Sequence, residues 1–180
     1  MNKSVYDSPD KVSENNRHIL TVLVDNEPGV LAKVIGMFSG RGYNIESLNV
    51  AEVSNDEHIS RITIVTQGTE EVVSQIDKQL LRIVPVHSVT NLDQEGSSVE
   101  AEVALVYIYV NESNKKNVYQ ICDFYRARKI ENENNSIIFE IAGASERINS
   151  FIKEISQITK IEIVRSGPVA ISTFKKNEEE

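Results

Sequence analysis

The sequence predicts an α+β protein made of two tandem units with the same order of secondary structure, βαββαβ. Three observations predict it. Apolar residues switch repeatedly between the two-residue period of strands and the three-to-four-residue period of helices. This succession of periods occurs twice along the 180 residues of the chain. Between the two occurrences lies 93-DQEGSS-98, a polar stretch with the composition of a linker.

The first unit begins with a strand and a helix. Residues 18–24, HILTVLV, are rich in β-branched and other aliphatic residues and suit a strand. Apolar residues then recur on one helical face from Val30 to Phe38, and Gly40 and Gly42 offer left-handed stops behind it. We therefore expect a strand, a helix and a sharp turn, in that order.

Two strands, a helix and a last strand complete the first unit. Residues 44–53 have an imperfect strand pattern, the polar segment 54–57 suits a hairpin turn, and the isoleucines that follow mark a third strand. A second helical stripe runs from Val72 to Leu81, and residues 85–92 suit a closing strand. The order of this unit is therefore βαββαβ.

The second unit repeats this order. The segments with strand character are 102–110, 128–132, 136–143 and 161–166. The apolar helical stripes run from Val118 to Tyr125 and from Ile148 to Ile155. A short edge strand is expected at 169–173.

Two tandem ferredoxin-like domains of roughly 75 residues each explain the chain length. We expect them at residues 17–92 and 99–174, joined by the linker 93–98, with a disordered leader at 1–16 and a disordered tail at 175–180. Each domain would place both helices on one face of an antiparallel sheet. The other face would be bare, so we expect self-association or partner binding.

Composition and charge exclude several classes of protein. The net charge of −8 and the lack of a basic patch disfavour nucleic acid as a partner. No apolar run approaches the ~18 residues of a membrane span, and the polar N-terminus lacks the core of a signal peptide. The single cysteine, Cys122, lies among apolar residues at helical spacing, which predicts a buried thiol. A chain without a disulfide suits a reducing compartment, so we expect a cytoplasmic protein.

No motif for catalysis or for a cofactor is present. His18, His58 and His87 lie in different expected strands, each without a second ligand at metal-binding spacing. Phosphate-binding loops and nucleophile elbows are absent. The carboxylates lie in charged turns and on exposed helix faces rather than in acid–base pairs. We therefore expect no catalytic residue, no metal and no cofactor in this chain.

The remaining signal lies around Gly29 and Asn44. Pro28 and Gly29 begin an apolar helix, where free N–H groups and the helix dipole favour a small anion such as a carboxylate. Asn44, at the start of the next strand, offers a donor and an acceptor. Apolar walls can come from Val30, Leu31 and Ile45. Together these groups describe a site for an α-amino acid, although a plain helix start and a turn cap explain the same residues equally well on physical grounds.

The stretch 26-NEPGVLAKVIGMFSGRGYNIESL-48 resembles the small, regulatory subunit of acetolactate synthase, also called acetohydroxyacid synthase. Further similarity lies in 60-SRITIVTQG-68, 76-IDKQLLRIVPV-86 and 165-RSGPVAIS-172. The resemblance spans residues 17–172 and is strongest in the first half. It implies that the first unit is an ACT domain and that the second is the ferredoxin-like C-terminal domain of that family.

The resemblance also implies a function. This chain would do no chemistry itself but would bind and activate a separate catalytic subunit, a transferase that carries thiamine diphosphate, magnesium and FAD. Its product leads to valine, leucine and isoleucine. Valine would inhibit by feedback, bound where the ACT domains of a homodimer meet. The residues that match the effector motif of the family are Asn26, Gly29, Val30, Leu31, Asn44 and Ile45.

Two other hypotheses belong to different classes. A free-standing ACT sensor of amino acids would regulate another enzyme or a transporter. An enzyme in its own right would show turnover without a partner. Purification from the native cell distinguishes them, because only a regulatory subunit is expected to bring a thiamine-diphosphate enzyme with it.

Overall fold

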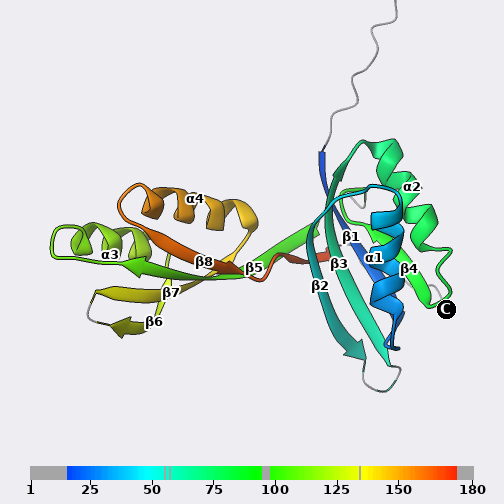
Figure 1. The fold of residues 1–180 in the computed structure, drawn as a ribbon, viewed down its shortest axis with the longest axis horizontal. Helices are drawn as coiled ribbons and strands as arrows, with labels where there is room; N and C mark the ends of the chain where they lie inside the picture. Colours follow the sequence, from blue (N-terminus) through cyan, green and yellow to red (C-terminus); the bar gives the residue numbers. More distant parts are fainter. Residues whose placement is uncertain (1–15, 55, 57, 95–97, 134, 174–180) are drawn as a thin grey trace, which may run out of the picture.

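The computed structural model describes residues 16–173, apart from 55, 57, 95–97 and 134. It consists of two α+β domains connected by two strands that cross from one domain to the other (Figure 1). Most of the expected leader and the expected tail lie outside the described residues, although Asn16, the last residue of that leader, already belongs to the first strand. No helix in the described ranges is long and apolar enough to cross a membrane.

The first domain has the order βαββαβ. Its elements are β1 (Asn16–Asp25), α1 (Val30–Gly40), β2 (Ile45–Ser54), β3 (Ile59–Gly68), α2 (Glu70–Leu80) and β4 (Val86–Asn91). The strands form one antiparallel sheet in the order β2-β3-β1-β4, and both helices cover the same face of it (Figure 1). Strand β2 therefore lies at one edge of the sheet and β4 at the other.

The second domain repeats the arrangement with one addition. Its elements are β5 (Ser98–Tyr109), α3 (Lys115–Phe124), β6 (Arg128–Glu133), β7 (Ser136–Gly143), α4 (Ser145–Ser156), β8 (Ile161–Arg165) and β9 (Val169–Ser172). The sheet order is β6-β7-β5-β8. The prediction of an α+β chain with two ferredoxin-like βαββαβ units is confirmed.

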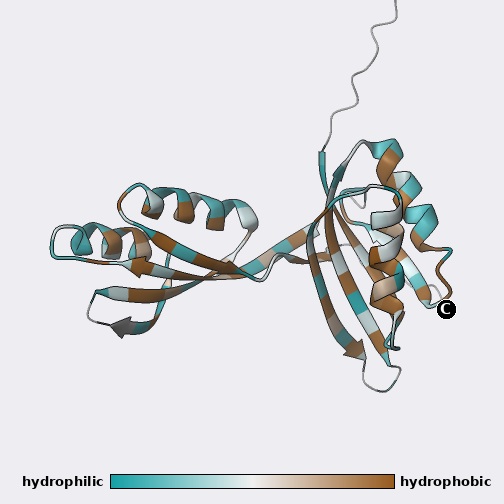
Figure 2. Ribbon diagram, viewed as in Figure 1, coloured by the Kyte–Doolittle hydropathy of each residue, from teal (hydrophilic) through white to brown (hydrophobic). Residues whose placement is uncertain are grey.

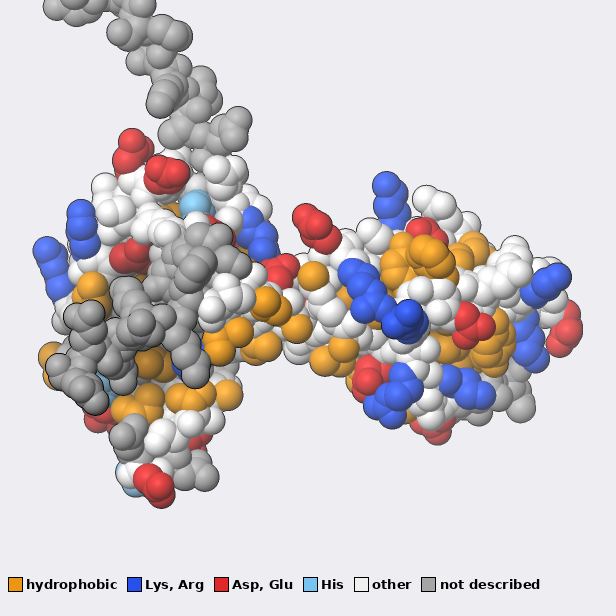
Figure 3. All heavy atoms as spheres, turned by 180° about the vertical axis from the view of Figure 1, so that it is seen from behind, with side chains coloured by type: hydrophobic (Ala, Val, Ile, Leu, Met, Phe, Trp, Pro, Cys, Tyr) orange, Lys and Arg blue, Asp and Glu red, His pale blue; other side chains and the backbone are white. Residues whose placement is uncertain are grey.

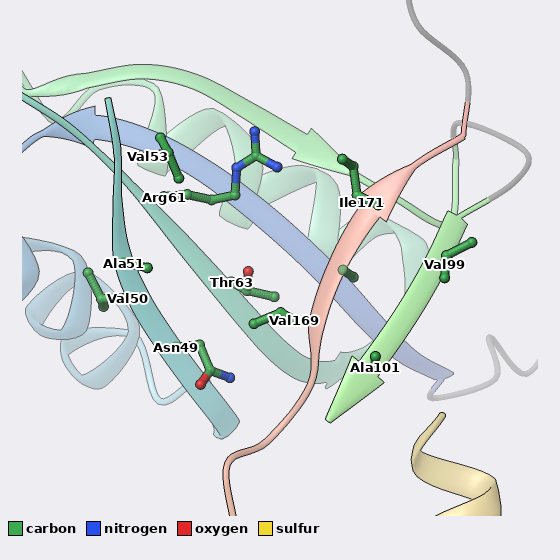
Figure 4. Close-up of a pocket in the computed structure, with 11 residues that line it drawn as sticks. Asn49, Val50, Ala51, Val53, Arg61, Thr63, Val99, Ala101, Val169 and Ile171 are labelled. Atoms are coloured by element: carbon green, nitrogen blue, oxygen red, sulfur yellow. The ribbon is translucent and has the colours of Figure 1, made fainter. Parts of the chain in front are cut away.

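The addition concerns β5 and β9. The sequence predicts that β5 begins near residue 102, but the strand starts at Ser98, and its first four residues pair with β9 (Val169 to Ser172). Strand β9 is thus not an edge of the main sheet. It forms a two-stranded ribbon with the start of β5, and this β5–β9 ribbon lies over the helix-free face of the first sheet (Figure 4).

Each domain has its own hydrophobic core between its sheet and its helices. Hydrophobic residues follow the central strands, whereas the helices alternate between hydrophobic and hydrophilic positions (Figure 2). In the first domain Val34 and Phe38 of α1 pack with Ile76 of α2. In the second, Cys122 is completely buried, and burial raises the pKa of its thiol to about 12. The prediction of a buried core thiol is confirmed.

The two domains meet at a small junction. A third cluster joins Ile19, Val65 and Leu92 of the first domain to Ala170 of β9. Close by, the side-chain amide of Asn49 on β2 donates a hydrogen bond to the carbonyl of Pro168 at 3.0 Å. Strand β2 is therefore tied to the segment that leads into β9.

Gly167 also belongs to this junction. Its φ is +74°, and a Cβ at this position would overlap the hydroxyl of Ser47 on β2. Glycine is therefore required at position 167 for two reasons: the left-handed backbone conformation and the close approach of the two domains.

Candidate functional site

The loop between β1 and α1 carries the first group of expected site residues. Residues 26–29 are all exposed. The N–H of Asn26 donates to the carbonyl of His58 at 2.6 Å, which anchors the loop on the β2–β3 turn. Gly29 precedes α1 with φ +89°, and nothing lies within 4 Å of the place where a Cβ would be. A glycine is therefore needed for the backbone conformation, and the space in front of the helix is open.

Two details of this loop differ from expectation. Pro28 lies in the turn before the helix rather than in its first turn, because the left-handed Gly29 separates them. His58 lies in the hairpin turn with φ +52° and not in a strand. The left-handed backbone at His58 turns the chain, whereas a strand requires an extended backbone. The strand propensity of the neighbouring residues does not reveal this conformation.

The start of α1 has free backbone donors. Among the described residues, the N–H groups of Leu31 and Ala32 meet no hydrogen-bond acceptor. The first turn of α1 contains no acidic side chain, whereas Thr69 caps α2 by accepting a hydrogen bond from the N–H of Val72. An uncapped helix start attracts an anion through its amides and through the helix dipole.

The acidic side chains of the loop already have partners. The carboxylate of Asp25 and the Nε2 of His87 are 2.6 Å apart. Glu27 lies 3.6 Å from the ammonium of Lys33. Each of these two carboxylates therefore has a side-chain partner away from the free amides at the start of α1.

The aliphatic residues of this group have different roles. Val30 is buried in the core of the first domain, with 6% of its surface exposed. Leu31 and Ile45 pack against the same core but remain half-buried. Of these three side chains, those of Leu31 and Ile45 keep part of their surface exposed.

Asn44 and Ile45 lie at the opposite end of α1 from Gly29. Asn44 immediately precedes β2, its side chain is exposed, and its carbonyl accepts a hydrogen bond from Thr66 at 2.6 Å. Helix α1 has 11 residues, so about 16 Å of helix separates the two groups. Within one chain the asparagine therefore does not face the glycine. The reason is topological, because α1 runs back along the sheet before β2 begins (Figure 1).

Strand β2 nevertheless returns to the end of the domain where Gly29 lies. It runs from Ile45 to Ser54, antiparallel to β3, and it is an edge strand. Its register shifts near both ends, between Ile45 and Ser47 and between Glu52 and Ser54. Such bulges limit regular pairing along the free edge to the central part of the strand.

Family models match both domains. Residues 20–88 match the AHAS small subunit-like ACT domain, and residues 101–173 match the model of the small subunit of acetolactate synthase. The acetolactate synthase isozyme 3 small subunit of Salmonella typhimurium is 41% identical over 161 residues, which cover 89% of this chain and 98% of that protein. The chain belongs to the acetolactate synthase small-subunit family.

Other members of the family are also similar along almost their full length. The probable acetolactate synthase small subunit of Archaeoglobus fulgidus is 36% identical over 155 residues, which cover 86% of this chain and 96% of that protein. A crystal structure of the small subunit from Thermotoga maritima superimposes with a TM-score of 0.80 at 34% identity, covering 89% of this chain and 99% of that one. The resemblance stated from the sequence is thus confirmed for both domains.

Proposed function

We propose that this chain is the regulatory subunit of an acetolactate synthase. It binds and activates a separate catalytic subunit in the cytoplasm and confers feedback inhibition by valine on branched-chain amino acid biosynthesis. Thiamine diphosphate, magnesium and FAD would belong to the catalytic subunit. The observation that carries this proposal is the similarity to acetolactate synthase small subunits through both domains.

Valine suits the groups at the two ends of α1. Its carboxylate would accept hydrogen bonds from the free amides of Leu31 and Ala32, in the open space in front of Gly29. Its isopropyl group would contact the exposed parts of Leu31 and Ile45. The side-chain amides of Asn26 and Asn44 offer oxygen acceptors for its ammonium group.

Two copies of the chain are needed to assemble this site. Gly29 follows β1 and lies at the end of the domain that β2 reaches last, whereas Asn44 lies at the start of β2. If the edge strands β2 of two copies pair antiparallel, the start of one β2 lies beside the end of the other. Asn44 of one copy then approaches Gly29 of its partner, and a two-fold axis creates two such sites. We therefore propose a homodimer through the ACT domains, with valine between the copies.

Regulation then follows from linkage. Valine changes the activity of the catalytic subunit only if it binds better to one arrangement of the dimer than to another, and such coupling is typically ~1–3 kcal/mol. The test of the function mixes the purified chain with its catalytic subunit and measures acetolactate formation with and without valine. We expect higher activity on mixing and inhibition by valine. A free-standing sensor would change neither quantity.

The shared site is tested by mixing two defective chains. Gly29→Asp places a carboxylate where the ligand carboxylate binds, and Asn44→Ala removes the amide, so a homodimer of either variant should lose valine binding. A heterodimer of the two has one doubly altered site and one intact site. Random mixing should therefore restore about a quarter of the wild-type number of sites, measured by calorimetry. If the mixture binds no valine, the site does not combine Gly29 and Asn44 of different copies.

A further inference from the structure

A groove lies at the junction of the two domains, separate from the proposed valine site. It encloses about 420 Å³ between the helix-free face of the first sheet and the β5–β9 ribbon. We call it the junction groove, and its principal residues are Val53, Arg61, Thr63, Val99, Val169 and Ile171. They come from β2 and β3 on one side and from β5 and β9 on the other (Figure 4). An occupant would therefore contact both domains at once.

Among the described residues that line this groove, Arg61 alone is charged. Its guanidinium lies in the space between Val53 and Ile171 (Figure 4). The Nε of Arg61 is buried, and it has no hydrogen-bond partner among the described residues. No described carboxylate lies within ion-pair distance of this side chain. A buried donor of a cation without a partner is costly, and a carboxylate is the group that matches the fork of a guanidinium.

The rim of the groove indicates a protein segment rather than a small molecule. Val53, Val99, Val169 and Ile171 expose 51%, 57%, 56% and 59% of their surfaces. Seen from behind, hydrophobic side chains gather where the first domain meets the second (Figure 3). A ligand that fills 420 Å³ would leave much of this rim in water. An apposed polypeptide would cover both the rim and the floor, as in the apolar centre of a protein interface.

A second copy of this chain fits the groove less well. In a two-fold interface the same patch meets itself, so the groove of one copy would face the groove of the other. The two Arg61 side chains would then approach each other with equal charge and without a carboxylate between them. Charge complementarity therefore favours a different chain that supplies an acidic side chain.

We propose that the junction groove is the docking site for an extended segment of the catalytic subunit, one with aliphatic side chains and a single Asp or Glu that pairs with Arg61. This inference rests on the proposed function, because it names the surface that such a regulatory subunit uses. Because the groove is built from both domains, its shape depends on how the domains are arranged, and docking there would report that arrangement to the catalytic subunit.

Photo-crosslinking tests the identity of the occupant. In one variant benzoylphenylalanine replaces Val169 in the groove. In the control variant it replaces Val84, which is 97% exposed in the loop before β4. The full-length chains are mixed with the catalytic subunit, irradiated and mapped by mass spectrometry. We expect a crosslink from position 169, but not from position 84, to a catalytic-subunit segment that contains an acidic residue. A crosslink to another copy, or to residues 1–15 of the same chain, overturns the proposal.

Affinity measurements test the role of the charge. Arg61→Met keeps the length of the side chain and removes the cation, and Val169→Asp places a carboxylate on the apolar wall. We expect each to weaken binding of the catalytic subunit about tenfold or more, as for a residue at the centre of an interface. Arg82→Met and Val84→Asp, on the exposed loop after α2, are the matched controls and should bind like wild type.

Valine calorimetry on the isolated variants separates a lost docking surface from a lost fold. Arg61→Met and Val169→Asp should bind valine like wild type. If both variants also bind the catalytic subunit with wild-type affinity, the docking proposal is overturned and the proposed function is not affected. If the wild-type chain binds no acetolactate synthase catalytic subunit, the proposed function fails, and this inference fails with it.

Discussion

Gly29 shows how one backbone angle keeps the start of a helix open at the proposed valine site. A residue with φ of +89° ends the loop after β1 and begins α1 without occupying the space in front of the helix. Any L-residue there would be strained even though no atom lies within 4 Å of its Cβ. The requirement is therefore conformational, and it is independent of whether a ligand is bound.

Gly29→Ala and Gly36→Ala should have opposite effects on stability. Neither Cβ would meet an atom within 4 Å, so the comparison isolates the backbone. Alanine at 29 is expected to cost about 1–2 kcal/mol because of the left-handed conformation. Alanine at 36, inside α1, is expected to stabilise by about 0.5–1 kcal/mol. Urea unfolding of both variants measures the difference, and equal signs would contradict the conformational explanation.

Asp77 gives a pH dependence of known sign. Burial raises the pKa of its carboxyl above the ordinary value, and the nearby His18 counteracts this only in part. The folded protein therefore holds this proton more tightly than the unfolded chain, so the contribution of Asp77 to stability falls as the pH rises through the raised pKa. Asp77→Asn cannot titrate. The unfolding free energy of the Asp77→Asn variant minus that of wild type should increase from about pH 4 to about pH 7. Urea titration of both proteins at each pH measures this difference. A constant difference would show that Asp77 does not titrate with a raised pKa.

At the scale of elements, β2 connects the two proposed sites. Asn44 and Ile45 of the proposed effector site lie immediately before and at its start, and Ser47 and Asn49 further along contact the segment before β9. A shift of β2 at the proposed valine site would therefore reach the β5–β9 ribbon within a few residues. The junction groove lies beside the same strand.

Gly167→Ala tests how tightly β2 is held. The added Cβ would overlap the hydroxyl of Ser47 and would lie 3.1 Å from its Cβ. We expect a loss of about 1–3 kcal/mol in unfolding free energy from overpacking, in addition to the backbone strain. Ser47→Ala in the same chain removes the overlapping oxygen and should recover part of the loss. A double-mutant cycle with no coupling between the two sites would contradict the contact.

The sequence alone predicts the helices and most strands because their apolar periods are regular. It misses the extra length of β5, since residues 98–101 are held by β9 and not by the sheet. It also identifies the helix start at Gly29 correctly. The separation of Asn44 from Gly29 follows from the path of α1 across the sheet, which local patterns do not contain. The roles of Asn49, Arg61 and Gly167 depend on contacts between domains. Arg61 and Gly167 lie in the family-like stretches 60–68 and 165–172, but that similarity does not indicate which contacts they make.

At the scale of the whole molecule, two separate cores are joined by a small apolar cluster and a two-stranded ribbon. Such a junction holds the domains side by side with much less buried surface than either core. If the valine site also requires two copies, ligand affinity depends on the association of whole chains. With both features, the proposed response to valine would be a property of the assembly.

Dilution should therefore weaken valine binding. Anything that binds only the dimer stabilises it by mass action, and the dimer must form before the site exists. We expect the apparent Kd for valine to rise when the chain is diluted below its dimer dissociation constant, measured by fluorescence-detected binding alongside analytical ultracentrifugation. An apparent Kd that does not change while the dimer dissociates would place the whole site within one chain.

The buried thiol of Cys122 has a practical consequence. The native chain contains one cysteine, which is fully enclosed and has a pKa of about 12, so it stays unreactive towards maleimide reagents at neutral pH. A fluorophore or spin label attached to a newly introduced surface cysteine would then report from that position alone. Distances between the domains, or between two copies, become measurable without first removing the natural sulfur.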